Sequence, residues 1–235
     1  MTGGTFTSNE YWFGNLYVLG SVVMDGNSTL SILPGTTIKF SSGTELKING
    51  TLIAQGSSSA PIQFTSAGSS NWSGIKFENS SSGTLKYCEI DHATYGVYVK
   101  ESKPTVENCE INNCTYGLYF YNTNSVSGSA EILSNKIHNN SNDGIYLYRS
   151  SPAIRENKIY NNPYGVHCIY FSSPYFGQLH YLGRNRFYSN SSSAIYAEFG
   201  SNPFLGYSNP VFPDGGYNHF DNSNGKHVMA AYLGS

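Results

Sequence analysis

The chain has 235 residues, of which 12% are charged, about half the share that is usual in soluble domains. Thirteen Lys and Arg against fifteen Asp and Glu give a formal net charge of −2, which argues against the clustered positive charge that nucleic-acid binding needs. No run approaches the roughly 20 apolar residues of a membrane span, and residues 1–10 lack the basic and apolar regions of a signal peptide. We therefore expect neither a nucleic-acid partner nor membrane insertion.

Short runs in which apolar and polar residues alternate extend along most of the chain. Residues 1–15 are expected to form a polar N-terminal cap. Residues 16–84 are expected to form irregular first coils, with runs at 37–40, 45–48, 51–54, 62–64 and 75–77. Residues 85–235 hold regular repeats with insertions at 122–129, 172–178 and 201–215. Alternation with period two predicts strands with one buried face, and no helix is expected.

The regular part repeats a unit of Gly, an apolar residue, an outward residue that is usually Tyr, and a second apolar residue. Its copies stand at 96–99, 117–120, 144–147, 165–168 and, with Ala in place of Gly, 194–197. Strands this short cannot stand alone, so each coil must complete the core of the next. We predict an all-β fold, a parallel β-helix solenoid of roughly ten coils, as a single domain over 1–235. An apparent strand at 228–231 lies just before the end, so we expect a larger parent chain.

Three segments in the first part carry a resemblance to a known family. They are Pro-Gly-Thr-Thr-Ile-Lys-Phe at 34–40, Asn-Gly-Thr-Leu-Ile-Ala at 49–54 and Trp-Ser-Gly-Ile-Lys-Phe at 72–77. They resemble the opening coils of right-handed parallel β-helix proteins of the pectate-lyase-like superfamily, and the later units look like its generic β-helix repeats. That superfamily includes polysaccharide lyases, glycoside hydrolases, epimerases, adhesins and non-catalytic surface modules, so the fold does not fix the activity. We expect a secreted or cell-surface protein of bacterial type, whose signal peptide is not in this sequence.

Two further series of residues recur in step with the repeats and are expected to stack at the corners of the coils. The first is Cys88, Cys109, Asn135, Asn157, Asn185 and Asn218, and the second is Ala93, Cys114, Asn140, Asn162, Asn190 and Ser223. Asn tolerates left-handed backbone, and its amide can hydrogen-bond to the bend and to the amide of the next coil. We interpret both series as structural. For Cys88 and Cys109 we favour buried thiols, with a disulfide as the alternative and no metal site.

The outward positions of the repeats place several tyrosines on one face. Stacked rings alone would stabilise neighbouring coils by about 0.5 to 1.5 kcal/mol per pair. The alternative is a flat row of rings that stacks against sugar faces and binds their hydroxyls, so that a polysaccharide lies along the rod. Both interpretations stay open. The candidate ligand-binding residues are Tyr98, Tyr119, Tyr121, Tyr146, Tyr148, Arg149, His167 and Tyr196.

A third outward series carries charge and is where an enzyme alternative would rest. Glu89 and Glu110 precede Lys136 in it, and a carboxylate pair beside a base could bind Ca²⁺ and a uronate while the base removes a proton. We favour a solvated ladder of alternating charge, in which Glu110 lies above Lys136. The paired aspartates, Gly-His-Gly and Arg-Ile-Lys segments of polygalacturonase relatives do not occur. If the chain is an enzyme, the catalytic candidates are Glu89, Glu110, Lys136 and His167.

His167 replaces Tyr in the outward row, with Asp143 and Arg149 flanking the neighbouring strand, so this is the best local mixture of acid, base and aromatic. His180 and Arg184 follow an insertion and are expected to overhang the same face. The sequence thus favours a module that binds polysaccharide or a cell-surface glycan without chemistry of its own. It needs no cofactor, although Ca²⁺ is possible. The alternatives are a lyase or epimerase that acts on uronate-containing glycans, and a structural spacer or adhesin repeat.

Overall fold

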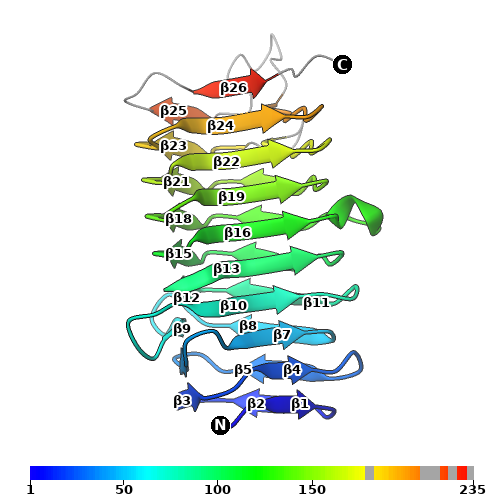
Figure 1. Ribbon diagram of the computed structural model, residues 1–235, viewed down its shortest axis with the longest axis vertical. Coiled ribbons are helices and arrows are strands. Elements are labelled where there is room, and N and C mark those ends of the chain that lie inside the picture. The colour runs from blue at the N-terminus through cyan, green and yellow to red at the C-terminus, as the bar shows by residue number, and fades with distance from the viewer. Residues whose placement is uncertain (178–182, 207–217, 222–226, 232–235) are drawn as a thin grey trace.

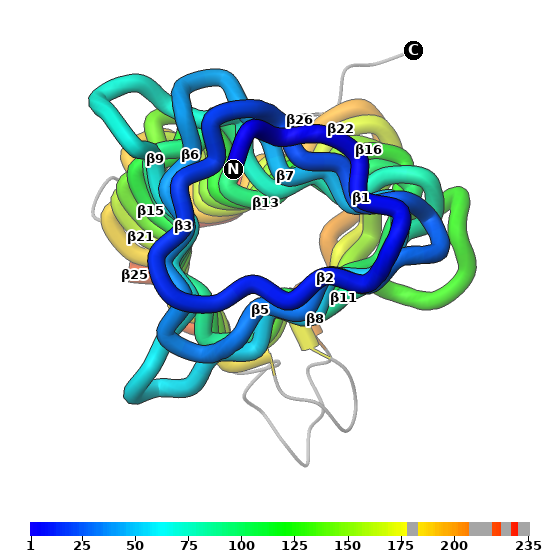
Figure 2. The backbone as a smooth tube through the Cα atoms, turned by 90° about the horizontal axis from the view of Figure 1, so that it is seen from below, coloured from blue at the N-terminus to red at the C-terminus, as the bar shows by residue number. Residues whose placement is uncertain are grey.

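The alternating runs form short strands that wind into three parallel β-sheets around one apolar core (Figures 1 and 2). The structure is a computed structural model and describes residues 1–177, 183–206, 218–221 and 227–231. Each strand pairs in parallel with the equivalent strand of the next coil, about one repeat away in sequence. The all-β parallel solenoid is therefore confirmed. Its single helical element in the described residues is the 3₁₀ turn η1 (Thr123–Ser125), which lies in the first expected insertion.

The described strands divide into ten in sheet A, seven in sheet B and nine in sheet C. Sheet A contains β1 (Gly4–Phe6), β4 (Val22–Met24), β7 (Glu45–Ile48), β10 (Trp72–Phe77), β13 (Ala93–Lys100), β16 (Tyr116–Tyr121), β19 (Asp143–Tyr148), β22 (Tyr164–Ile169), β24 (Ser193–Glu198) and β26 (Val228–Ala231). Sheet B contains β2 (Glu10–Trp12), β5 (Thr29–Ile32), β8 (Thr51–Gln55), β11 (Ser82–Lys86), β14 (Thr105–Glu107), β17 (Glu131–Leu133) and β20 (Ala153–Arg155). Sheet C contains β3 (Asn15–Val18), β6 (Thr37–Phe40), β9 (Ile62–Ser66), β12 (Cys88–Asp91), β15 (Glu110–Asn112), β18 (Lys136–His138), β21 (Lys158–Tyr160), β23 (Arg186–Tyr188) and β25 (His219–Asp221).

The number of complete coils differs slightly from the expected ten. Only about seven turns in the described part of the chain contribute a strand to every sheet, because sheet B ends at β20. Beyond β20, sheet B continues only as isolated parallel bridges that join Ala153 to Tyr175 and Tyr175 to Phe204. Tyr175 and Phe204 lie in the expected insertions at 172–178 and 201–215.

Apolar side chains of successive coils stack directly above one another in the core. In sheet C, Ile90, Ile111, Ile137 and Ile159 occupy one register and are fully buried. The N-terminal segment 1–15, expected to be a polar cap, contributes β1 and β2, which pair with β4 and β5. Trp12 lies almost fully buried in that first coil. This segment therefore already extends the core of the solenoid.

Polar ladders run along the corners, as Asn157 shows. Its Nδ2 donates to Oδ1 of Asn185 in the next coil at 3.0 Å and to the Ile132 carbonyl at 2.9 Å. Its Oδ1 accepts from the backbone N–H of Asn135 at 2.9 Å. One expectation was wrong in detail, since the left-handed residue at these corners is the one just before the ladder residue, such as the exposed Glu156 (φ 60°). The buried Asn that follows is not in the left-handed region, and its side-chain amide hydrogen-bonds to backbone groups at the bend.

A hydroxyl ladder at the corner where the strands of sheet A end was not expected. There Ser150 Oγ accepts from the N–H of Thr123 at 3.2 Å, and Ser172 Oγ accepts from the N–H of Ser150 at 3.1 Å. Small hydroxyl residues are common throughout this sequence, which hides the series. In the coils that carry these ladders, a buried side chain from the next coil therefore accepts a backbone N–H at each of the three corners.

The four cysteines are buried and free, which confirms buried thiols over a disulfide for Cys88 and Cys109. The Sγ atoms of both donate to backbone carbonyls, at 3.4 Å to Ala54 and to Leu85 respectively. Burial raises the pKa of the Cys114 thiol to about 12. These buried thiols therefore act as small ladder and core groups.

Candidate functional site

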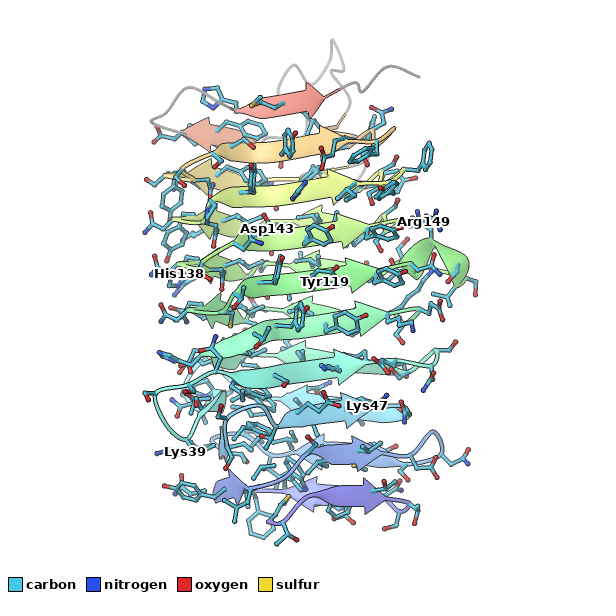
Figure 3. All side chains as sticks on the ribbon, viewed as in Figure 1. Lys39, Lys47, Tyr119, His138, Asp143 and Arg149 are labelled. Carbon is cyan, nitrogen blue, oxygen red and sulfur yellow. The ribbon has the colours of Figure 1, made fainter. Side chains whose placement is uncertain are left out.

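The outer surface of sheet A from β13 to β24 carries more than half of the tyrosines that the structure describes, in three parallel rows that we call the tyrosine face (Figure 3). The middle row holds Tyr98, Tyr119, Tyr146, His167 and Tyr196, in register from coil to coil as expected. A second row holds Lys100, Tyr121, Tyr148, Ile169 and Glu198. A further row holds Tyr95, Tyr116, Asp143 and Tyr164. The outward tyrosines are half-buried.

Sequence reasoning missed the row of Tyr95, Tyr116 and Tyr164, although each of these tyrosines directly precedes the repeat Gly. The reason is a local break in the period of two, because both the Gly and the residue after it are buried. A Cβ on Gly117 would lie 2.5 Å from the carbonyl oxygen of Gly144. The Gly is therefore required by close contact between coils, and the Tyr–Gly pair is the signal for this row.

The ring faces on the tyrosine face are largely covered by other rings. Tyr119 stacks on Tyr98 at 5.4 Å between centroids and on Tyr146 at 4.6 Å, with interplanar angles of 22° and 19°. Tyr95 and Tyr116 stack in the same way and meet Tyr119 edge-on. The flat row with open ring faces, which was the alternative interpretation of the sequence, therefore does not form here. Rings stacked along the rod direct their edges and phenol groups outward.

Burial raises the pKa of Tyr98 and of Tyr146 to about 12, and that of Tyr119 above its usual value as well, with neighbouring phenols and carboxylates adding to the effect. These phenols stay protonated across the physiological range, so each hydroxyl can both donate and accept a hydrogen bond. The face thus presents neutral hydroxyl groups in a dense array.

His167 interrupts the middle row and is held between two carboxylates. Its Nδ1 lies 3.7 Å from Oδ2 of Asp143, and its Nε2 lies 3.3 Å from Oε1 of Glu198. Asp143 is only 1% exposed, and its Oδ1 has no hydrogen-bond partner. Burial raises the pKa of Asp143. Burial opposes the charge on His167, but the two carboxylates outweigh it and raise the pKa of His167. Both imidazole nitrogens are engaged, so a protonated His167 offsets part of the charge of the two carboxylates.

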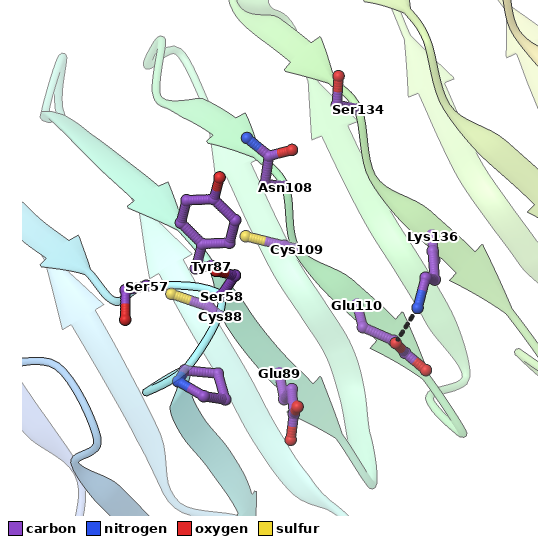
Figure 4. Close-up of a pocket in the computed structure, with 11 residues that line it drawn as sticks. Ser57, Ser58, Tyr87, Cys88, Glu89, Asn108, Cys109, Glu110, Ser134 and Lys136 are labelled. Carbon is purple, nitrogen blue, oxygen red and sulfur yellow. Dashed lines mark hydrogen bonds and ion pairs between the residues drawn. The ribbon is translucent and has the colours of Figure 1, made fainter.

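The charged residues of the enzyme alternative lie on sheet C. Glu89 and Glu110 occupy directly paired positions on β12 and β15, beside a pocket of about 270 Å³ that Tyr87 and Ser57 also line (Figure 4). Lys136 is held by Glu110 at 3.0 Å, as the alternating charge ladder predicts.

Glu110 also accepts from a histidine that the catalytic candidates did not include. His138 Nε2 lies 3.1 Å from Oε1 of Glu110. Burial favours the neutral carboxyl, but Lys136 and His138 outweigh it and hold the pKa of Glu110 below its usual value. His167 lies on sheet A, so the structure brings together three of the four catalytic candidates and not the fourth.

The comparison with known proteins agrees with this geometry. A family model described as a right-handed β-helix region matches residues 5–181 and 125–209. The chain belongs to the right-handed β-helix family. No curated protein and no solved structure gives a significant match. The finer resemblance to the pectate-lyase-like superfamily stays a prediction.

Some of the residues named in the sequence predictions are not among those that the structure describes. His180, Ser223 and residues 232–235 lie outside them. Among the described residues, no group of three or more His, Cys, Asp or Glu is placed to hold a metal ion. Glu89 and Glu110 alone provide fewer oxygen atoms than the six to eight that Ca²⁺ takes. Within the same residues no helix is long and apolar enough to cross a membrane.

Proposed function

We propose that this β-helix is a secreted or cell-surface module that binds a polysaccharide or cell-surface glycan along the tyrosine face and is not catalytic by itself. The observation that carries the proposal is the dense array of half-buried phenols on one side of the rod, among which those of Tyr98, Tyr119 and Tyr146 stay protonated. Sugar hydroxyls donate and accept hydrogen bonds, and so do neutral phenols. Five neighbouring strands with a spacing of about 4.8 Å span about 19 Å from the first to the last, which suits a chain rather than a single sugar.

The charge distribution supports a neutral glycan as the ligand. Asp143 and Glu198 are the carboxylates on the face, and both lie against His167. On the coils before β13 the outward charges of sheet A are also paired, with Lys47 on Glu78 and Lys76 on Glu45. Charges that are paired in this way make little net electrostatic contribution to binding an ionic polymer.

The lyase or epimerase alternative needs Glu89, Glu110, Lys136 and His167 around one substrate. Three of them line the pocket on sheet C, and Lys136 is engaged by Glu110. His167 lies on sheet A with both nitrogens occupied. This separation is the reason for preferring binding over chemistry. Turnover of uronate polymers to unsaturated products in an absorbance assay would contradict the non-catalytic part of the proposal.

The binding part is tested with a glycan array and the double variant Tyr119→Phe with Tyr146→Phe. Each substitution keeps the stacked ring and removes only the hydroxyl, so the fold should persist while glycan binding falls by about tenfold or more. The matched control is Tyr160→Phe with Tyr188→Phe, a pair stacked at 4.5 Å on sheet C. The control should bind like the wild type. Absence of binding by the wild type across a broad array would contradict the proposal and favour a structural spacer or adhesin repeat.

A further inference from the structure

The corner at which the strands of sheet A end carries the most exposed aromatic ring near the tyrosine face. Phe171 directly follows Tyr170 at this corner and is 68% exposed. Tyr170 itself stacks on Phe199 of the next coil at 4.7 Å and 8°. It also meets Tyr148 of the preceding coil at 4.9 Å. We call Tyr148, Arg149, Tyr170, Phe171 and Phe199 the corner ridge.

Phe171 has an unfavourable backbone conformation for a bulky residue. Tyr170 and Phe171 are consecutive residues in the left-handed region, with φ of 52° and 61°. That region costs an ordinary side chain roughly 1–2 kcal/mol. A large exposed ring at such a position contributes little to the core, so its presence points to a role outside folding.

Two other coils have a residue at the position equivalent to Phe171. Two consecutive left-handed residues also occur at Asn79 and Ser80 and at Phe199 and Gly200. The second residue of the pair is Ser80 and Gly200 in these two coils, and Phe171 in the third. Small residues meet the needs of the bend, and Phe171 is the exception.

The structure accommodates the Phe171 ring through a neighbouring glycine. A Cβ added to Gly200 would lie 2.6 Å from Cε1 of Phe171, so the ring lies directly against the Gly200 backbone. Its contact with Gly200 fixes one side of the ring, while most of its surface stays open to solvent. This is the open ring surface that the stacked rows of the tyrosine face do not offer.

Arg149 provides hydrogen-bond donors at the same corner, on the coil before Phe171. Ser150 and Ser172 are neighbours in the hydroxyl ladder, so Arg149 and Phe171, which precede them, lie on adjacent coils. Arg149 is exposed at the end of the sheet A strands, with its Cζ 5.5 Å from the centroid of the Tyr148 ring (Figure 3). It makes no ion pair with any residue that the structure describes. Its guanidinium N–H groups are therefore available to a ligand.

We infer that the corner ridge is a sugar subsite in which a pyranose ring stacks its CH face on Phe171 and a sugar hydroxyl accepts from Arg149. The inference rests on the proposed function and extends it, since the phenols of the tyrosine face bind hydroxyls of the same glycan while Phe171 holds one sugar ring by its apolar face. Stacking on a single open ring, with a directional donor beside it, fixes the position of that sugar.

The test is the affinity of Phe171→Ser for a glycan selected by the wild-type protein on the array, measured by calorimetry. Ser is the residue at the equivalent position 80, so the variant should fold and unfold at an equal or higher temperature than the wild type. Its affinity should fall about tenfold. The matched control is Phe13→Ser, which removes a ring of 67% exposure on the first coil and should leave affinity unchanged.

A second variant guards against an unexpected loss of structure. Arg149→Asn keeps a residue that tolerates φ of 46° and should weaken binding several-fold with no change in unfolding temperature. Wild-type affinity in both Phe171→Ser and Arg149→Asn would overturn the subsite while leaving the proposed function intact. If the wild type binds no glycan, the proposed function fails first. If the tyrosine double variant loses binding and Phe171→Ser does not, the ligand lies on the tyrosine face alone. That result would overturn the subsite.

Discussion

At the scale of single residues, His167 shows how one substitution in a row of tyrosines changes its chemistry. The imidazole takes the place of a phenol and meets Tyr146 edge-on at 5.2 Å. Asp143 replaces a tyrosine in the adjacent row and reaches the same imidazole. His167 and Asp143, which each replace a tyrosine in neighbouring rows, therefore form one acid–base pair. Burying either charged residue without the other would be unfavourable.

This pair makes stability depend on pH. Because the carboxylates of Asp143 and Glu198 raise the folded pKa of His167, the folded protein holds the proton more tightly than the unfolded chain does. The resulting stabilisation is fully present below the unfolded pKa of about 6.5 and is lost as the pH rises through the folded value. The pKa of Asp143 is also raised, so it does not reverse this sign.

We expect the free energy of unfolding, measured in urea, to fall between pH 6 and pH 8.5 in the wild type. His167→Asn should remove most of that decrease. His92→Asn, at an exposed histidine in left-handed backbone, is the control and should keep the wild-type profile. Identical pH profiles for the wild type and His167→Asn would contradict the role assigned to the pair.

At the scale of elements, the corner ladders hold adjacent coils together through buried amides. Asn157→Ala would leave the N–H of Asn135 and the carbonyl of Ile132 without their ladder partner. Each buried group left unpaired costs about 1–3 kcal/mol. We expect a loss of at least about 2 kcal/mol in the free energy of unfolding.

The matched comparison is Asn161→Gly, an exposed neighbour in the left-handed region with φ of 53°. Gly accepts that conformation, so this variant should stay within about 0.5 kcal/mol of the wild type. Equal effects of the two substitutions in denaturant unfolding would show that the stability lies in the bend and not in the buried amide.

Strands and corners differ in how far the sequence predicts them. The period of two and the recurring Asn predicted the strands of sheets A and C and the ladder hydrogen bonds, because both depend on residues in regular spacing. The row of Tyr95, Tyr116 and Tyr164 was missed because the repeat Gly breaks the alternation. The exposed position of Phe171 depends on one extra corner residue, which no spacing rule reveals.

At the scale of the whole molecule, the repeat explains why the fold is predictable and the site only partly so. Each coil copies the register of its neighbour, so the solenoid follows from one unit. Which outward rows share a sheet depends on where the corners fall, and this separates His167 from Glu89, Glu110 and Lys136. Ring orientation depends on stacking between coils, which turned an expected flat aromatic surface into an array of phenol edges.

The most direct test of the account is a crystal structure of the protein with an oligosaccharide selected on the glycan array. We expect the ligand to lie along sheet A between β13 and β24, with hydrogen bonds to the hydroxyls of Tyr119 and Tyr146 and one sugar on Phe171. An oligosaccharide bound instead in the pocket of Glu89, Glu110 and Lys136, with sheet A unoccupied, would contradict it.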